Sequence, residues 1–376
     1  MNFETYPFEK LNELLKDIEP NGELEPLTLT IGEPQFETPE FIQEELCKSS
    51  NLLKKYPKSA GEDVLRESQI GFVKRRFGVE LKKDELIPTF GTREVLFNLP
   101  QFLLFDKASP TMAFTNPFYQ IYEGAGIASR AEIFHLNLTK KNNFKALPSE
   151  YKEILKKADL VIINFPNNPT ASSLSLDELC LWVEASEKYD FVLINDECYS
   201  EIYQGQPDSS LLEASLKVGN SEFKNILVLN SISKRSSAPG LRSGFVAGDA
   251  KILKEYMRYR TYVGCASPLP LQIASAKAWS DDEHVAKSRE IYRKNFELAK
   301  EILGVEIPNS TFYIWLEVED DLLVTKRLFR EQNLKVLPGS FLSRGKFETK
   351  HIRIALVEDE KKTKEALLRI KATLKR

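Results

Sequence analysis

Short apolar runs alternate with amphipathic stretches between about residues 85 and 250. The apolar runs are rich in Val, Ile, Leu and Phe, and they predict buried strands at 111–117, 131–138, 159–166, 191–197 and 225–231. The stretches 149–159 and 175–190 between them have the spacing of helices. Buried strands that alternate with helices are typical of a mostly parallel sheet covered on both faces. The pattern therefore predicts an α/β fold with its ligand site at the carboxyl ends of the strands.

The pattern changes after about residue 265, where a long helical stretch begins. Apolar runs and helical patterns of an α+β unit follow it at 312–319, 325–333, 336–340, 351–357 and 359–376. The early segment LTLTIGEPQF is expected to pack on this second lobe or between the lobes. We therefore predict a large domain of residues 46–275 and a small domain made of residues 1–45 and 276–376.

Composition narrows the possible partners. The 376 residues include 52 basic and 55 acidic side chains, a net charge of −3, so neither nucleic acid nor an anionic membrane is indicated. The acidic N-terminus does not read as a signal peptide, and a cytoplasmic protein is expected. The four cysteines and three histidines are scattered. We therefore expect no metal site, no disulfides and no hydrolase of the Ser-His-Asp type.

The segment 231–248, SISKRSSAPGLRSGFVAG, carries the clearest chemical signal. Lys234 lies among small residues, with Ser231 and Ser233 before it and Arg242 after it. A lysine that forms an imine needs partial desolvation and an anion held nearby. Pyridoxal phosphate meets both needs, since the lysine takes its aldehyde and the serines and arginine take its phosphate. The alternative is a surface loop with solvated basic residues.

Three further side chains follow predicted strands. Asp196 ends a buried strand, where a carboxylate is costly unless it is compensated, and a protonated pyridine nitrogen would compensate it. Tyr199 and Asn168 are candidate donors to the ring oxygen of the same cofactor. Taken singly, Asp196 has an alternative role as a helix cap or turn residue, and the other two as turn or interface residues.

Two more motifs add candidates. Gly91, Thr92 and Arg93 open a helical pattern, and their backbone amides with the Thr92 hydroxyl make a phosphate cradle. Tyr119 follows a strand and is placed to stack on a flat heterocycle. The alternatives are a well-capped helix and an ordinary core aromatic.

An arginine on a predicted strand of the small domain completes the candidate set. Arg353 lies amid Ile and Leu in HIRIALV, where its charge requires an anion. A bidentate contact with the α-carboxylate of an amino acid meets this requirement. An internal salt bridge is the alternative.

Eight motifs occur in the order of one known family: IGEP, YPKSAG, GTREVLF, NPFYQIYEGA, NFPNNPT, NDECYSEIY, SISKRSSAPGLRSGFVAGD and the arginine of HIRIAL. Over nearly its whole length, the chain resembles the fold-type I, class I/II aminotransferases, which use pyridoxal phosphate. The resemblance implies a large domain whose mostly parallel sheet is sandwiched by helices, a smaller α+β domain and a homodimer.

The resemblance also implies roles for individual residues. Lys234 would bind the cofactor covalently and shuttle the proton at the substrate α-carbon, and Asp196 would pair with the pyridinium nitrogen. The other implied contacts are Asn168 and Tyr199 on the ring oxygen, Tyr119 on the ring face, Ser231, Arg242, Gly91, Thr92 and Arg93 on the phosphate, Gly32 and Arg353 around the α-carboxylate, and Tyr56 on the phosphate of the neighbouring subunit. Ala171 departs from the family pattern, which often has glycine after NPT.

Within the family, the chain is most similar to the N-succinyldiaminopimelate aminotransferases of lysine and peptidoglycan biosynthesis. The opening YPFEKLNELL carries this similarity, together with four later segments: NPFYQIYEGA, DECYSEIY, SISKRSSAPGLRSGFVAGD and YRTYVGCASP. Such a substrate needs a further cation, for which Arg235, Arg258 and Arg260 are candidates. Glutamate is the expected amino donor, in a ping-pong cycle. The alternatives are an aminotransferase for aspartate or aromatic amino acids, a C–S lyase, and a cofactor-binding regulator without catalysis.

Overall fold

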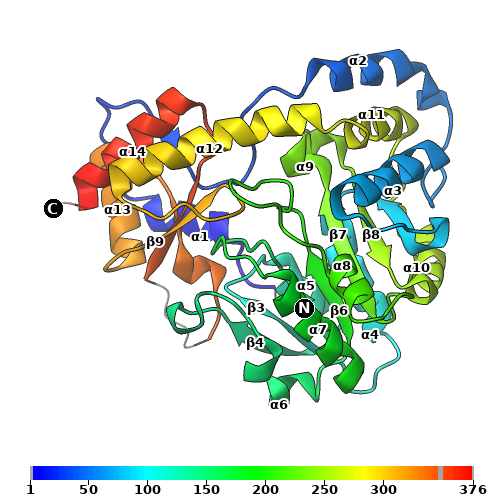
Figure 1. Ribbon diagram of the computed structural model, residues 1–376. Coiled ribbons are helices and arrows are strands. Elements are labelled where there is room, and N and C mark those ends of the chain that lie inside the picture. The colour runs from blue at the N-terminus through cyan, green and yellow to red at the C-terminus, as the bar shows by residue number, and fades with distance from the viewer. Residues whose placement is uncertain (1–2, 346–349, 375–376) are drawn as a thin grey trace.

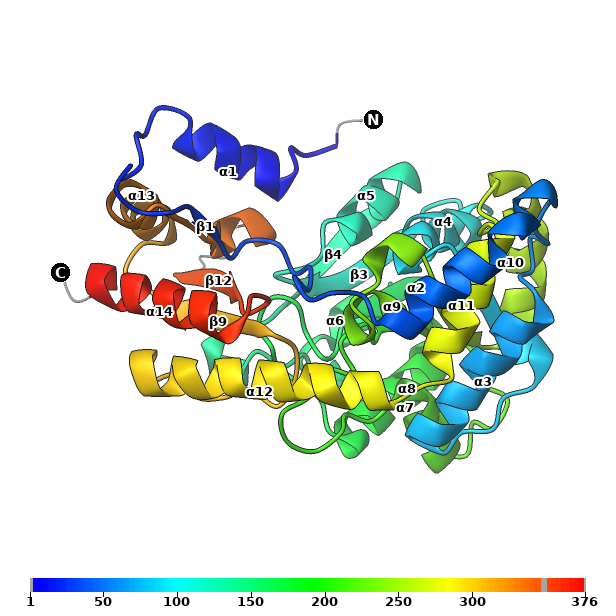
Figure 2. The same ribbon diagram turned by 90° about the horizontal axis from the view of Figure 1, so that it is seen from above.

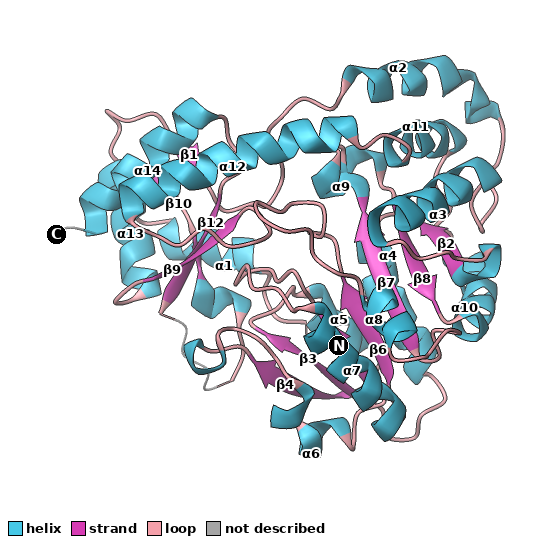
Figure 3. Ribbon diagram, viewed as in Figure 1, coloured by secondary structure: helices cyan, strands magenta, loops and turns pink. Residues whose placement is uncertain are grey.

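A computed structural model describes residues 3–345 and 350–374. Its largest sheet has seven strands in the order β2-β8-β7-β6-β5-β3-β4 (Figure 3). β8 runs antiparallel to both of its neighbours, and the other pairs are parallel. The strands are β2 (Leu86–Thr89), β3 (Thr111–Asn116), β4 (Glu132–Asn137), β5 (Leu160–Ile163), β6 (Val192–Asp196), β7 (Ile226–Ser231) and β8 (Gly244–Gly248). The mostly parallel α/β sheet predicted from the sequence is confirmed.

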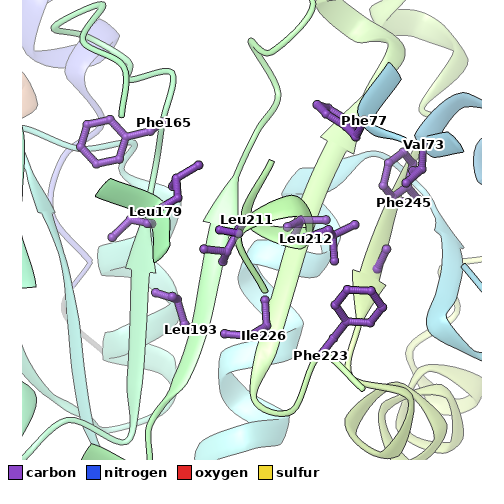
Figure 4. Packing of buried hydrophobic residues seen from close by; sticks show 14 of the residues in the cluster. Val73, Phe77, Phe165, Leu179, Leu193, Leu211, Leu212, Phe223, Ile226 and Phe245 are labelled. Atoms are coloured by element: carbon purple, nitrogen blue, oxygen red, sulfur yellow. The ribbon is translucent and has the colours of Figure 1, made fainter. Parts of the chain in front are cut away.

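Helices cover both faces of this sheet (Figure 1). They are α3 (Asp63–Phe77), α4 (Thr92–Leu104), α5 (Ile121–Ala128), α6 (Lys152–Leu155), α7 (Leu176–Tyr189), α8 (Leu211–Lys217), α10 (Ala250–Val263) and α11 (Leu269–Trp279). Successive strand residues point to opposite faces, so Leu193 joins the cluster under α3, α7, α8 and α11, whereas Ile194 joins the one under α4, α5 and α10. Figure 4 shows the first cluster, in which Leu193 and Ile226 of neighbouring strands face Leu211 and Leu212 of α8.

The second lobe is built on a three-stranded antiparallel sheet in the order β11-β12-β9, with the small pair β1-β10 beside it. Its strands are β1 (Leu27–Thr28), β9 (Tyr313–Glu317), β10 (Leu334–Lys335), β11 (Leu337–Pro338) and β12 (His351–Ala355). Its helices are α1 (Pro7–Leu15), α12 (Glu283–Leu303), α13 (Asp321–Gln332) and α14 (Glu360–Leu374). A separate apolar cluster, which includes Leu29, Phe296 and Leu367, forms its core. This is the α+β arrangement expected from the sequence.

Two stretches of chain connect the lobes. The helix α12 runs along the molecule from the end of α11 into the small lobe (Figure 2). Residues 29–39 return from β1 to α2 (Glu40–Ser49), which packs on α11 of the large lobe. The domain boundaries at residues 45 and 275 stay a prediction. Within the described ranges, none of the helices combines the length and apolarity needed to cross a membrane.

Candidate active site

A pocket of about 770 Å³ lies between the lobes at the carboxyl end of the large sheet. Asp196 and Ser231 are the last residues of β6 and β7, so two neighbouring strands point their ends at it. Twelve of the side chains or backbone positions singled out from the sequence line the pocket: Gly32, Thr92, Arg93, Tyr119, Asn168, Asp196, Tyr199, Ser231, Ser233, Lys234, Arg242 and Arg353. The topology therefore brings together residues that lie up to about three hundred positions apart in the chain.

Lys234 lies on the short helix α9 (Ile232–Arg235), which begins directly after β7. The Ser231 side chain caps this helix by accepting a hydrogen bond from the backbone N–H of Ser233 at 3.2 Å. The Nζ of Lys234 donates a hydrogen bond to the backbone carbonyl of Gly32. Burial in the pocket lowers the pKa of Lys234 to about 8, because desolvation disfavours the charged amine. A sizeable neutral fraction of this amine is therefore available near physiological pH.

Asp196 lines the same pocket and is only 5% exposed. Its carboxylate accepts a hydrogen bond of 2.8 Å from the hydroxyl of Tyr122 and one of 3.3 Å from the backbone N–H of Cys198. Burial raises the pKa of Asp196, while these two donors act in the other direction by stabilising the ionised form. The group is thus a buried carboxylate without a cation of the described chain beside it. A bound cation would find its charge partner here.

One end of the pocket is a cradle for an anion. Gly91 caps α4, so the backbone N–H groups of Thr92 and Arg93 lie at a helix N-terminus. The hydroxyls of Ser231 and Ser233 are 2.9 Å apart beside it. Arg242 closes the cradle, and a Cβ added to Gly91 would lie 2.3 Å from its Nη2. Glycine at position 91 therefore leaves room for the guanidinium group.

Arg353 on β12 contributes a second cation to the pocket from the small lobe. Its Nη1 donates to Oδ1 of Asn168 at 2.7 Å and its Nη2 to the carbonyl of Thr30 at 2.6 Å. The Nε has no hydrogen-bond partner among the described residues, although Arg353 is only 4% exposed. Its guanidinium carbon lies 4.5 Å from the ring centre of Tyr313. Arg353 forms no ion pair with a described carboxylate, so the internal salt bridge considered as an alternative is absent from this part of the structure.

Tyr199, Tyr313 and Gly32 also line the pocket. The hydroxyls of Tyr199 and Tyr313 are 3.0 Å apart, and burial raises the pKa of Tyr199 well above its ordinary value. A Cβ added to Gly32 would lie 1.8 Å from the Tyr313 hydroxyl, so only glycine fits there. Nε of Arg93 donates a 2.8 Å hydrogen bond to the hydroxyl of Tyr119.

Comparison with known proteins identifies the family. The model of the family described as aminotransferase class I and II matches residues 25–370. This chain belongs to that family.

Solved structures and curated relatives agree with this family. The chain is similar to the aminotransferase AspB from Helicobacter pylori 26695, with 49% identity, a TM-score of 0.97 and 100% of both chains covered. It is also similar to an aminotransferase from Neisseria meningitidis Z2491, with 38% identity, a TM-score of 0.94, and 99% of this chain and 98% of that one covered. An LL-diaminopimelate aminotransferase from Natranaerobius thermophilus is 30% identical over 98% of this chain and 97% of its own length.

Class I and II aminotransferases use pyridoxal phosphate, and this pocket fits that cofactor. The anion cradle around Gly91 and Arg242 suits the phosphate, and the buried carboxylate of Asp196 suits a protonated ring nitrogen. The Lys234 amine lies in the same pocket. When bound, the cofactor supplies a carbonyl that condenses with amines and a ring that withdraws electrons from the adjacent carbon. Within the described residues, no group of His, Cys, Asp or Glu side chains could hold a metal ion.

The three arginines that were candidates for binding the distal part of the substrate are bonded to carboxylates of this aminotransferase instead. Arg235 is fully buried and bonds the carboxylate of Asp282 at 2.9 Å, and Arg260 is 1% exposed and bonds Glu94 at 3.0 Å. Arg258 pairs with the neighbouring Glu255 at 2.7 Å on the surface. None of these three arginines lines the pocket of its own chain in the described residues. Arg235 is turned into the core, whereas Arg258 and Arg260 were expected near the subunit interface, and their contact with a substrate stays a prediction.

Three tyrosines also differ from what the sequence indicated or leave a prediction open. Tyr56 is fully exposed and lies outside the pocket wall of its own chain, so its role in a neighbouring subunit stays a prediction. Tyr122 and Tyr313 also line the pocket but were not predicted from the sequence. The first follows Tyr119 by three positions, which places both on one face of α5 and its leading turn, and this spacing was a usable signal. Tyr313 comes from the small lobe, and its local sequence gave no such signal.

Proposed function

We propose that this pyridoxal-phosphate-dependent aminotransferase exchanges amino groups between N-succinyl-L,L-diaminopimelate and 2-oxoglutarate, with glutamate as the donor in the biosynthetic direction. The observation that carries the proposal is the convergence of Lys234, Asp196 and Arg353 on one pocket. The amine, the carboxylate and the guanidinium group match the three demands of amino-group transfer: a proton carrier, a partner for the ring nitrogen and a binder of the substrate carboxylate.

Arg353 is proposed to bind the α-carboxylate of the substrate. A guanidinium group offers two parallel N–H donors to a carboxylate, and the unpartnered Nε of Arg353 supplies one of them. Asn168 and Thr30 hold the other nitrogens, so the plane of the group is fixed before the substrate enters. This fixed plane would orient the α-carbon toward Lys234.

Lys234 is proposed to carry the proton at the α-carbon. A general base works best when its pKa lies near the working pH, and a pKa of about 8 meets this condition. Asp196 is proposed to stabilise positive charge on the cofactor ring, with Tyr122 holding its carboxylate in place. Thr92, Ser231, Ser233 and Arg242 are proposed to hold the phosphate, and Tyr199 and Asn168 the ring oxygen.

The distal carboxylates of the proposed substrate need a second cation, and Arg93 is the candidate inside the pocket. Its Nε donates to the Tyr119 hydroxyl, whereas its two terminal nitrogens form no hydrogen bond within the described chain. Arg242 is proposed to bind the phosphate and Arg353 the α-carboxylate, so neither is available for the distal carboxylates. The backbone amide of Arg93 can still face the phosphate while its side chain points to the substrate.

A homodimer is proposed for the assembly. Exposed aromatic side chains are costly in water, and Tyr56 and Tyr262 are 101% and 92% exposed. Nη1 of Arg260 donates to the carbonyl of Ser59 at 3.3 Å, so the segments that carry the two tyrosines are adjacent. Light scattering should give the mass of two chains for the wild type and a larger monomer fraction for Tyr56→Ala. The cytoplasmic location stays a prediction.

Steady-state kinetics with 2-oxoglutarate test the substrate. N-succinyl-L,L-diaminopimelate should have a higher kcat/KM than aspartate or an aromatic amino acid. Arg93→Met should lower kcat/KM for the succinylated substrate by roughly tenfold, one charge-assisted hydrogen bond, and leave an uncharged amino acid unaffected. Much faster turnover of aspartate or an aromatic amino acid would contradict the proposed substrate. Release of ammonia and pyruvate from a sulfur amino acid would identify a lyase instead.

LL-diaminopimelate itself is a second candidate, because a relative with that activity in its name is 30% identical over nearly the whole chain. The two substrates differ at the distal nitrogen, which is an ammonium in one and a succinyl amide in the other. Glu33 also lines the pocket and would attract the ammonium but repel the succinyl carboxylate. Glu33→Gln should therefore raise kcat/KM for the succinylated compound and lower it for LL-diaminopimelate.

A further inference from the structure

The three residues that follow Lys234 are bonded to the chain at or next to the two connections between the lobes. Arg235 donates to the carbonyl oxygens of Ala278 and Asp281, at the junction of α11 and α12. The Ser236 hydroxyl lies 2.8 Å from Nε2 of His284 in the first turn of α12. The carbonyl of Ser237 accepts a 2.7 Å hydrogen bond from the hydroxyl of Thr38, which belongs to the other connection. The helix α9 contacts α11, and Figure 1 shows it near the start of α12.

The contact with α12 is built from three polar side chains. Nδ1 of His284 lies 2.5 Å from Oδ1 of Asp281, and Nε2 faces Ser236 on the other side of the ring. Burial lowers the pKa of His284, so the ring is neutral at physiological pH. The Nδ1–H then donates to Asp281, and Nε2 accepts from the Ser236 hydroxyl. Each of the three side chains is thereby fixed by the next.

This order of Ser, His and Asp is the one that hydrolases use, but the site does not allow that chemistry. Ser236 is fully buried and His284 is only 8% exposed. Neither residue lines the pocket between the lobes, and this burial keeps a carbonyl substrate away from the hydroxyl. The arrangement therefore serves the position of the chain around Ser236.

Arg235 strengthens the same attachment. Its side chain packs against the ring pair Phe72 and Trp279, with the guanidinium carbon 4.9 Å and 5.3 Å from the two ring centres. Its Nη2 also bonds the carboxylate of Asp282. The end of α9 is thus attached to the α11–α12 junction by a guanidinium group and by His284. The side chain of Lys234, in turn, reaches the carbonyl of Gly32 on the other connection.

We propose that His284 is a positioning residue for Lys234, which it holds in register with the small lobe through Ser236. The inference rests on the proposed role of Lys234 as the cofactor-linked proton carrier. A four-residue helix has little rigidity of its own, so its orientation is set by what its ends are bonded to. Loss of the contact between His284 and Ser236 lets α9 shift while the pocket itself stays intact. A shift of about 1 Å in a catalytic group is enough to slow a reaction by up to 100-fold.

Paired substitutions separate positioning from general stability. His284→Asn keeps a donor near Nδ1 for Asp281 but cannot reach Ser236, whereas His284→Gln places its amide near Nε2 and keeps that contact. Ser236→Ala removes the contact from the other side without changing the histidine. Ser186→Ala is the matched control, because Ser186 is equally buried and donates a single 2.7 Å hydrogen bond, to the carbonyl of Phe191 away from α9.

The holoenzymes are compared by thermal unfolding, by kcat and KM for the glutamate half-reaction, and by the pH midpoint of the cofactor's visible absorption. The midpoint reports the protonation of the nitrogen that joins Lys234 to the cofactor, which a purely structural loss does not change. His284→Asn and Ser236→Ala should lower kcat by about tenfold with little change in KM, and should shift the midpoint. His284→Gln should stay close to wild type in both, and so should Ser186→Ala.

Equal kcat and equal midpoints for Ser236→Ala and Ser186→Ala would overturn the inference. So would His284→Gln if it were as impaired as His284→Asn. A wild-type protein that shows neither a visible cofactor band nor a half-reaction would instead refute the role of Lys234, and that failure is seen before any variant is made.

Discussion

Arg353 and Asn168 are joined across the two lobes by a hydrogen bond of 2.7 Å from Nη1 to Oδ1. One residue lies on β12 of the small sheet, and the other follows β5 of the large sheet. The bond keeps the guanidinium group at the edge of the pocket although the two residues are 185 positions apart in the chain. The guanidinium group that is proposed to bind the substrate carboxylate is therefore held in place by a contact from the opposite lobe.

This relationship predicts that Arg353→Lys is not a conservative change. A lysine keeps the charge but loses the planar pair of donors, so kcat/KM for every amino acid substrate should fall by roughly 10- to 100-fold, the equivalent of one charge-assisted hydrogen bond. Arg369→Lys is the control. Arg369 is similarly buried in the small lobe and bonds the carbonyls of Glu25 and Gln332 outside the pocket. Comparable losses in both variants would contradict a substrate contact.

The hydrogen bond from Tyr122 to Asp196 predicts a pH effect. The hydroxyl stabilises the ionised carboxylate, so Tyr122→Phe should raise the pKa of Asp196 further above its ordinary value. Activity that needs this carboxylate ionised is then lost at a higher pH, so the acidic limb of the kcat/KM profile should move to higher pH.

Tyr256→Phe is the control for this shift. Tyr256 is fully buried on α10, and its hydroxyl has no hydrogen-bond partner among the described residues. Its removal should leave the profile unchanged. An unmoved acidic limb in Tyr122→Phe would show that Asp196 does not govern it.

The sequence predicted most of the sheet because its central strands are continuous apolar runs. It missed β2 and β8, which are the short antiparallel pair at one edge. Their sequences, LIPT and GFVAG, contain proline or glycine, which weaken a strand signal. Partners in the sheet, rather than local preference, make these segments extended.

Site residues that directly follow a strand could be predicted from the sequence. The direction in which a side chain points from a helix could not. Lys234 and Arg235 are neighbours in sequence, yet side chains of successive helical residues point about 100° apart. One faces the pocket and the other faces Phe72 and Trp279 in the core. A basic residue beside the lysine was therefore no guide to substrate binding.

Ala171 predicts a stabilising substitution. Its φ of 59° lies in the left-handed region, which costs a residue with a Cβ about 1–2 kcal/mol. Ala171→Gly should therefore raise the free energy of unfolding by roughly 0.5–1 kcal/mol after the added chain entropy is subtracted. Ala113→Gly, in the buried strand β3, should lower it by about 1 kcal/mol. Chemical denaturation measures both, and the same sign for the two would contradict the argument.

The lowered pKa of Lys234 predicts how stability depends on pH in the cofactor-free protein. The value falls from 10.5 to about 8, so the folded state disfavours the charged amine. This cost is complete below pH 8 and disappears as the pH rises through 10.5, because over that range the unfolded chain holds the extra proton. Lys234→Met should be more stable at pH 7, by on the order of 2 kcal/mol. The advantage should shrink between pH 8 and 10.5.

Lys294→Met controls for the loss of a lysine as such. Lys294 is exposed on α12, so its replacement should change the free energy of unfolding little and equally at each pH. A constant difference between wild type and Lys234→Met across the same range would contradict a desolvated amine at this position.

Gly91 and Gly78 allow the anion cradle to be tested by substitutions with and without a contact to Arg242. Both have positive φ values, 73° and 68°. Gly78 has a ψ of 9° and lies in the left-handed region, where an alanine should cost about 1 kcal/mol of stability. Gly91 has a ψ of 160°, a region essentially restricted to glycine, so an alanine there should cost more. They differ in surroundings. A Cβ on Gly91 would lie 2.3 Å from Nη2 of Arg242, whereas one on Gly78 would meet no atom within 4 Å.

Gly91→Ala should therefore displace the guanidinium group and weaken pyridoxal phosphate binding by roughly tenfold or more, the equivalent of one charge-assisted hydrogen bond. Gly78→Ala should bind the cofactor as tightly as wild type. Titration of the cofactor-free proteins by absorbance measures both affinities, and equal dissociation constants for the two variants would rule out Arg242 as a phosphate contact.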